Sequence, residues 1–270
     1  MLNRASKPFV KLVERYLPDP YIFVLLLTLI TFAFAVVIQN QSPLTTVQQW
    51  GDGFWGLLTF SMQMLLVLVT GFMLACTPLV KALLERLASV AKSPGSAIVL
   101  VTLVSLIASW INWGFGLVVG ALFAKALARK VTVDYRLLVA SAYSGFIVWH
   151  GGLAGSVPLT IATPGHFSEA QIGVMSTSET IFSGFNLLLL AIMFVVIPLV
   201  NRLMLPPKSE SVIVDSTKLQ DDALPSAENE RPADKLENSK ALGLLVGFAG
   251  LAYLTNYFAS GGGLNLNIVN

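Results

Sequence analysis

The residues best able to do chemistry lie in one short segment of a long apolar stretch. His150 is followed by Gly151, Gly152 and Gly155, and Pro158 comes shortly after them. Glycine and proline disfavour the interior of a helix, and backbone freed at membrane depth is tolerated only where it lines an enclosed or watery cavity. The segment therefore predicts a broken membrane helix at a binding site.

His150 carries the ionisable group of this break. Ionisable side chains inside a membrane are rare and mostly functional, so the imidazole could take up a proton or contact a carboxylate directly. The structural alternative is a neutral imidazole that satisfies the carbonyl groups freed by the break. Both interpretations stay open on the sequence alone.

A second interruption lies in the preceding apolar stretch, at residues 109–116 (SWINWGFG). Two mid-membrane interruptions in consecutive segments are typical of secondary transporters, in which exposed helix N–H groups favour an anion and unpaired carbonyls can hold a cation. Neutral hydroxyl and amide groups beside these breaks would add hydrogen bonds. The predicted substrate-binding residues are Ser109, Asn112, Gly114, His150, Gly151, Gly152, Gly155, Ser156 and Thr160.

Composition indicates an integral membrane protein. Hydrophobic residues make up 55% of the chain and charged residues 12%, and soluble domains carry about a quarter charged residues. The 17 basic residues nearly balance the 15 acidic ones and lie in short loops, so the charge reports topology and does not predict nucleic-acid binding. Cys76 is the only cysteine, which excludes an intramolecular disulfide.

Enzyme signatures are weak. The chain has no Gly-x-Ser-x-Gly, no pair of histidines at metal-ligand spacing and no phosphate-binding Gly-x-x-x-x-Gly-Lys loop. An intramembrane serine protease is a remote alternative. Such a protease needs a Gly-x-Ser-Gly turn, and residues 142–145 (AYSG) have alanine in place of its first glycine. We therefore predict no catalytic residue, no metal and no organic cofactor.

The elements that position the site are predicted to be all helical. We expect an interfacial amphipathic helix at residues 7–17 and about five membrane crossings, the third broken at mid-membrane. Basic residues precede the first crossing and are absent from the loop after it, which places the N-terminus in the cytoplasm. The predicted crossings are residues 21–38, 55–79, 137–163, 181–200 and 241–258.

The apolar stretch 97–124 needs a different interpretation. Basic residues flank both of its ends, and its 28 residues are too few for two crossings of about 20 residues each. A cytoplasmic-side re-entrant hairpin, with arms of about 12 residues that turn at Asn112 and Gly114, satisfies both constraints. One long tilted helix is the alternative.

Domain organisation follows from the same pattern. Residues 1–200 form an N-terminal transmembrane repeat, and residues 201–240, with six basic and eight acidic residues, predict a disordered or loosely ordered cytoplasmic linker. Residues 241–270 would begin a second, incomplete transmembrane half. Four crossings are predicted before residue 201, because the hairpin does not cross the membrane. Four is an even number, whereas an inverted repeat needs an odd number of crossings.

Three segments closely resemble the bacterial short-chain fatty acid transporters associated with acetoacetate and butyrate use. They are residues 13–23 (VERYLPDPYIF), 109–116 and 149–159 (WHGGLAGSVPL). The resemblance implies the general plan of the wider ion-transporter superfamily, with inverted repeats, re-entrant hairpins and broken helices. It also implies transport of short monocarboxylates such as butyrate or acetoacetate across the inner membrane, coupled to H⁺ or Na⁺.

The chain departs from that family in length, because family members carry a second apolar half after the polar linker. We therefore expect a truncated chain whose site is completed either by a homo-oligomer or by a partner carrying the missing half. The alternative is a transport-inactive membrane fragment or subunit. The expected partners are a short-chain monocarboxylate and the lipid bilayer, with no nucleic acid.

Overall fold

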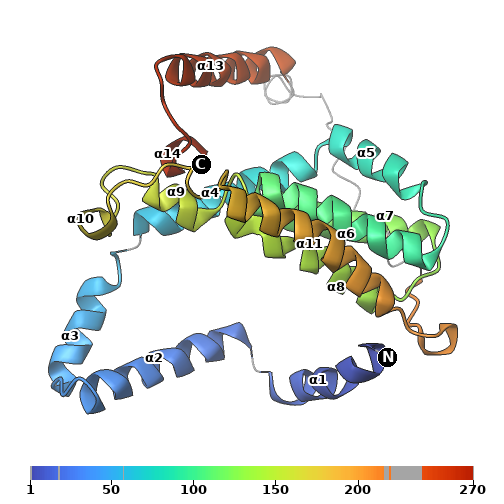
Figure 1. The fold of residues 1–270 in the computed structure, drawn as a ribbon, viewed down its shortest axis with the longest axis horizontal. Helices are drawn as coiled ribbons and strands as arrows, with labels where there is room; N and C mark the ends of the chain where they lie inside the picture. Colours follow the sequence, from blue (N-terminus) through green and yellow to red (C-terminus); the bar gives the residue numbers. More distant parts are fainter. Residues whose placement is uncertain (1, 18, 57, 216–218, 220–238, 270) are drawn as a thin grey trace, which may run out of the picture. The chain divides into compact units, whose positions relative to one another are not determined.

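The protein is helical throughout the part of the chain that the structure describes. The computed structural model describes residues 2–17, 19–56, 58–215, 219 and 239–269 (Figure 1). Every regular element in these ranges is a helix, which confirms the all-α membrane class. The chain divides into two compact units, residues 1–67 and 68–270, which are described separately.

The first unit contains three complete helices: α1 (Leu2–Tyr16), α2 (Pro20–Val37) and α3 (Pro43–Gly53). Asp19 begins α2, because its carboxylate accepts the N–H of Tyr21 at 2.9 Å and Pro20 occupies the first helical position, where no N–H is needed. The predicted crossing 21–38 thus corresponds to α2. The predicted helix 7–17 lies mostly within α1, which starts five residues earlier.

The second unit holds the broken helix and the hairpin. α4 (Leu58–Ala75) begins in the first unit and continues into the second. The helices that follow are α5 (Pro78–Ala88), α6 (Pro94–Ile111), α7 (Trp113–Lys130), α8 (Tyr135–Ser144), the 3₁₀ helix η1 (Gly145–Gly151), α9 (Ser156–Ile161), α10 (Glu169–Ile172), α11 (Gly184–Leu203), the 3₁₀ helix η2 (Lys208–Glu210), α13 (Lys240–Ala259) and α14 (Leu266–Val269).

Five segments of the described chain are long and apolar enough to cross a membrane, so this is a multi-pass membrane protein. They are Pro20–Val37, Pro94–Ile111, Tyr135–Ile161, Gly184–Leu203 and Lys240–Ala259. A sixth candidate is the pair Phe60–Ala75 and Pro78–Ala88, which is bent by 64°. The predicted crossing 55–79 is therefore interrupted, because Pro78 has no N–H to continue α4 and Thr77 caps a new helix.

α6 and α7 form a helical hairpin with antiparallel arms that turns at Asn112, as predicted (Figure 1). The single long helix is therefore wrong, because the chain reverses at this residue. Because α6 alone is long and apolar enough to cross a membrane, the re-entrant placement of this hairpin stays a prediction. Each arm has 18 residues, about 27 Å of helix, and not the predicted 12 or so. The arms are longer because a Ser93–Ser96 capping box starts α6 early and α7 continues through its basic end to Lys130.

The core of this unit lies where α6 and α7 meet α5 and α8. Its largest fully buried side chains include Ile98, Phe123, Leu127 and Leu138. α11 packs on the other side of α6 and η1, where Leu190 joins the smaller buried cluster that also contains residues 106 and 148. Both interruptions of the sequence therefore lie in elements that pack against α6 or continue from it.

The first part of the predicted linker is bound to the helices. α11 continues to Leu203, and the N–H of Tyr135 donates to the Val212 carbonyl at 2.9 Å. The Val212 N–H donates to the Asp134 carboxylate at 2.8 Å. Residues 216–218 and 220–238, which the linker prediction also covers, lie outside the described residues.

Candidate functional site

Asn112 forms the tip of the hairpin. Its extended backbone, with φ −153° and ψ 126°, ends α6 and begins α7. Its side-chain oxygen accepts the N–H of Phe115 at 3.0 Å, and its carbonyl accepts the N–H of Gly116 at 2.9 Å. The first two N–H groups of α7, those of Trp113 and Gly114, have no hydrogen-bond acceptor among the described residues. These free donors lie at the positive end of an 18-residue helix.

Gly114 is buried because α4 crosses the first turn of α7. A Cβ atom added to Gly71 of α4 would lie 2.5 Å from the Phe115 nitrogen and 2.8 Å from the Gly114 carbonyl carbon. No side chain fits at Gly71 without displacing backbone. α4 is thus part of the wall around the hairpin tip.

The break in the third predicted crossing contacts this tip directly. The N–H of Leu153 donates to the carbonyl of Trp110 at 2.7 Å, which satisfies a carbonyl that the last turn of α6 leaves free. A Cβ on Gly152 would lie 2.3 Å from the same Trp110 oxygen. The glycine is therefore required by a close approach of two backbones. The structure brings together the two interruptions that the sequence placed in one site.

Asn186, at the start of α11, is a residue that the sequence analysis missed. Its side-chain nitrogen donates to the carbonyls of Gly151 at 3.0 Å and Ile181 at 2.6 Å. A Cβ on Gly151 would lie 2.5 Å from the Asn186 side-chain oxygen. The available signal was an amide in the first turn of an otherwise apolar helix.

His150 is exposed and lies against an aromatic group formed by Trp113, Phe146 and Trp149. Its ring centroid is 3.8 Å from that of Trp149, and Trp149 stacks on Phe146 at 5.1 Å. Trp113 meets Trp149 edge to face at 5.8 Å. Within the described chain the imidazole makes no hydrogen bond, and Asn186 satisfies the Gly151 carbonyl. The structural alternative, an imidazole bonded to freed carbonyls, is not what the structure shows.

Three buried polar atoms near the tip have no hydrogen-bond partner in the described chain: the hydroxyl of Ser109 and the indole nitrogens of Trp110 and Trp113. Ser109 is only 1% exposed and packs against Gly116, where a Cβ would lie 2.3 Å from its hydroxyl oxygen. A buried indole N–H usually has an acceptor, and an unsatisfied one costs about 1–3 kcal/mol. The tip therefore holds two indole N–H donors that have no acceptor among the described residues.

Gly155, Ser156 and Thr160 have local roles on the far side of the break. The N–H of Gly155 donates to the Gly152 carbonyl at 3.0 Å, which closes the turn before α9. The Thr160 hydroxyl donates to the Ser156 carbonyl at 2.6 Å, the usual i−4 bond of threonine in a helix. Ser156 and Thr160 form no hydrogen bond with the described residues of the hairpin tip.

The sequence comparisons identify the family. The family model described as "Short chain fatty acid transporter" matches residues 1–270. The chain belongs to this transporter family. Two curated relatives, each named "Putative short-chain fatty acid transporter", come from Escherichia coli strain K12, at 46% identity, and from Haemophilus influenzae, at 40%. Both alignments cover 100% of this chain, and no solved structure matches it.

Membership of the short-chain fatty acid transporter family confirms the resemblance found in the sequence. The family is one of transporters and not of enzymes, which agrees with the prediction of no enzyme activity. The chain spans 62% and 63% of the lengths of the two relatives. The relatives are thus longer than this chain, as the sequence analysis expected of the family.

Proposed function

We propose that this chain forms one wall of the substrate site of a secondary transporter that carries short-chain fatty acids, such as butyrate and acetoacetate, across the bacterial inner membrane. The observation that carries the proposal is the hydrogen bond from Leu153 to Trp110, which joins the hairpin tip to the helix break. Discontinuous helices that meet in this way are how many secondary transporters build a site.

Donor groups at the tip suit a carboxylate. The free N–H groups of Trp113 and Gly114 lie at a helix N-terminus, and the unpartnered indole nitrogens of Trp110 and Trp113 are close to it in the chain. Hydrogen bonds from neutral donors to an ionised acceptor are stronger than those between neutral groups. An anion can therefore be held there without a lysine or arginine.

The aromatic group beside the tip suits a short apolar chain. The ring centroids of Trp113, Phe146 and Trp149 lie within 6.4 Å of one another, and the His150 ring contacts Trp149 at a tilt of 43°. Butyrate offers three carbons beyond its carboxylate, and each CH₂ removed from water contributes about 0.8 kcal/mol. Transport would be coupled to H⁺ or Na⁺, with His150 as the group that takes up the proton or contacts the carboxylate.

Topology completes the proposal. The N-terminus would lie in the cytoplasm, because the basic residues before α2 have no counterpart in the loop that follows it. The relatives' greater length supports the alternative in which this chain is a transport-inactive fragment or subunit. In that case a partner, or a second copy, supplies the opposite wall.

Uptake in proteoliposomes tests the transport proposal. Protein of the relatives' full length should accumulate labelled butyrate or acetoacetate when an inward H⁺ or Na⁺ gradient is imposed. Absence of uptake under both gradients would contradict it. Uptake by the 270-residue chain alone would remove the fragment alternative, whereas co-purification with a chain that restores uptake would favour a subunit.

Histidine substitution tests the site itself. His150→Ala should lower uptake at least tenfold and leave membrane insertion intact, because it removes the ionisable group at the break. His166→Ala is the matched control, since His166 is the other histidine and its ring contacts the Gly173 carbonyl in the loop after α9. Equal uptake by the two variants would return His150 to a packing role against Trp149.

A further inference from the structure

A basic hollow lies at the opposite end of the helices from the hairpin tip. It has a volume of about 730 Å³ and is bounded by the start of α6, the end of α7 and the segment that follows α11. Lys92, Lys130 and Lys208 line it, together with one carboxylate among the described residues, that of Asp134. The candidate substrate site at the hairpin tip includes none of these residues.

The lining carboxylate is already engaged by its own hydrogen-bond partners. Asp134 accepts hydrogen bonds from Arg136 at 2.9 Å and from the N–H groups of Val212 at 2.8 Å and Leu137 at 2.9 Å. Burial raises the Asp134 pKa, but these three hydrogen bonds outweigh it and hold the pKa below its ordinary value. Asp134 therefore stays ionised and is committed to its own partners, so it does not offset the lysines.

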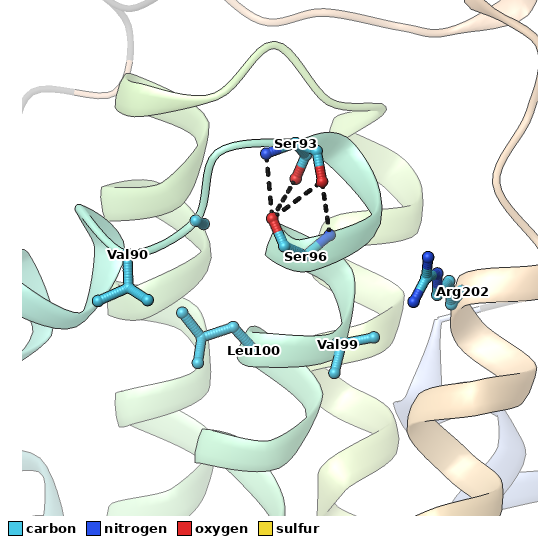
Figure 2. Close-up of a pocket in the computed structure, with 7 residues that line it drawn as sticks. Val90, Ser93, Ser96, Val99, Leu100 and Arg202 are labelled. Atoms are coloured by element: carbon cyan, nitrogen blue, oxygen red, sulfur yellow. Dashed lines mark hydrogen bonds between the residues drawn. The ribbon is translucent and has the colours of Figure 1, made fainter.

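A smaller apolar groove shares Ala91 with the basic hollow, and Figure 2 shows its lining. It has a volume of about 270 Å³ and its walls are the side chains of Val90, Val99 and Leu100. Ser93 and Ser96 also line it, but their hydroxyls are engaged with each other in the cap of α6 (Figure 2). Hydrocarbon walls with no free hydroxyl suit an acyl chain.

Arg202 lies between the two hollows. It lines the apolar groove, and a Cβ on Gly95, which lines the basic hollow, would be 3.4 Å from its guanidinium nitrogen Nε. The side chains of Arg202, Lys92 and Lys208 form no ion pair with any residue that the structure describes. Within the described chain, three cations without an ion pair thus lie beside one apolar groove.

We infer that these two hollows together bind one acidic phospholipid, with its phosphate among Lys92, Lys208 and Arg202 and one acyl chain along Val90, Val99 and Leu100. Basic pockets between membrane helices attract anionic headgroups, and the adjoining groove gives the hydrocarbon chain a place that free phosphate would not use. The inference does not rest on the proposed transport function.

Native mass spectrometry of the whole 270-residue chain in mild detergent tests the lipid site. Phosphatidylglycerol should bind at least tenfold more tightly than phosphatidylcholine of the same chain length. The double variant Lys92→Gln/Arg202→Gln should bind phosphatidylglycerol roughly thirtyfold more weakly, since two basic side chains are removed. Lys81→Gln/Arg86→Gln on α5 is the matched control, because it removes the same charge away from both hollows and should bind normally.

The inference would be overturned by equal binding of the two lipids or by equal loss in the test and control variants. Displacement of phosphatidylglycerol by millimolar inorganic phosphate would also overturn it. The last result would show a phosphate site with no role for the groove. Val90→Trp is a second test that should leave the fold intact, because Val90 is 65% exposed. It should fill the groove and weaken binding of the diacyl lipid, and unchanged binding would also contradict the inference.

Discussion

α6 and α13 are apolar helices of similar length with opposite surroundings. α6 has 18 residues, of which eight are buried, whereas α13 has 20 residues, of which none is buried. Both would be predicted as crossings from hydropathy alone. The two helices differ in the contacts that their small and polar residues make with neighbouring helices.

Small residues around α6 are in backbone contact. A Cβ on Gly116 or Gly152 would lie 2.3 Å from an atom of α6, and one on Gly145 would lie 2.5 Å from Ser105. α13 has a comparable row at Gly243, Gly247 and Gly250, yet nothing lies within 4 Å of a Cβ at these positions. Glycine spacing therefore indicates a helix surface that is able to pack closely. Whether another helix packs on that surface is known only from the contacts in the structure.

Polar side chains show the same contrast. On α6, Thr102 accepts a hydrogen bond from Asn201 of α11 at 3.0 Å, and Asn201 also donates to Ser144 at 2.7 Å. On α13, Thr255 bonds only to the Leu251 carbonyl of its own helix, at 2.7 Å. Thr102 of α6 therefore links its helix to α11, whereas Thr255 of α13 bonds within its own helix.

The largest expected effect comes from closing the gap at the break. Gly152→Val would drive its side chain into the Trp110 carbonyl and break the Leu153 hydrogen bond to that oxygen. Because the obstructing atom is backbone, we expect a loss of about 3 kcal/mol or more in unfolding free energy, measured by denaturation in mixed SDS micelles.

Gly247→Val on α13 is the control for that substitution. Its side chain meets open space, so the change should stay within about 0.5 kcal/mol. Similar losses at Gly152 and Gly247 would show that the contrast between α6 and α13 does not describe the folded protein.

The sequence was sufficient for the local elements. The apolar runs located α2, α11 and α13 to within a few residues, and the glycines with His150 located the break. Asn112 and Gly114 were predicted as the turn because they lie in the interruption at the middle of one apolar stretch. These features are encoded by neighbours in the chain.

Contacts between distant residues could not be predicted. Asn186 is 35 positions from Gly151 and Asn201 is 99 positions from Thr102, so no local pattern connects them. The predicted arms of the hairpin were too short, because the prediction counted only the apolar residues and did not include the capping box at Ser93. Thr160 was assigned to the site from polarity alone, although its hydroxyl bonds within α9.

Removing the amide that holds the break should have the next largest effect. Asn186→Ala deletes both hydrogen bonds to the Gly151 and Ile181 carbonyls and leaves the carbonyls without these donors. We expect a loss of about 2 kcal/mol in the same SDS measurement. Asn256→Ala, an exposed amide on α13, should change little. An Asn186 variant as stable as the Asn256 control would mean that α11 does not hold the break in place.

The smallest effect distinguishes the caps of the two kinds of helix. Asp134 caps α8 and its pKa is held below the ordinary 3.8 by hydrogen bonds that outweigh burial, whereas the cap of α13 is the uncharged Ser239. A lowered pKa means that the stabilisation is complete above the unfolded value and is lost as pH falls through the folded one. The melting temperature of the wild type should therefore decrease when the pH falls below about 4.

Asp134→Asn should have a lower melting temperature at neutral pH and should lose part of this pH dependence. Ser239→Ala should keep the pH dependence of the wild type. If Asp134→Asn kept the full slope, the titrating group would lie elsewhere in the protein, and the cap of α8 would act through its geometry and not through its charge.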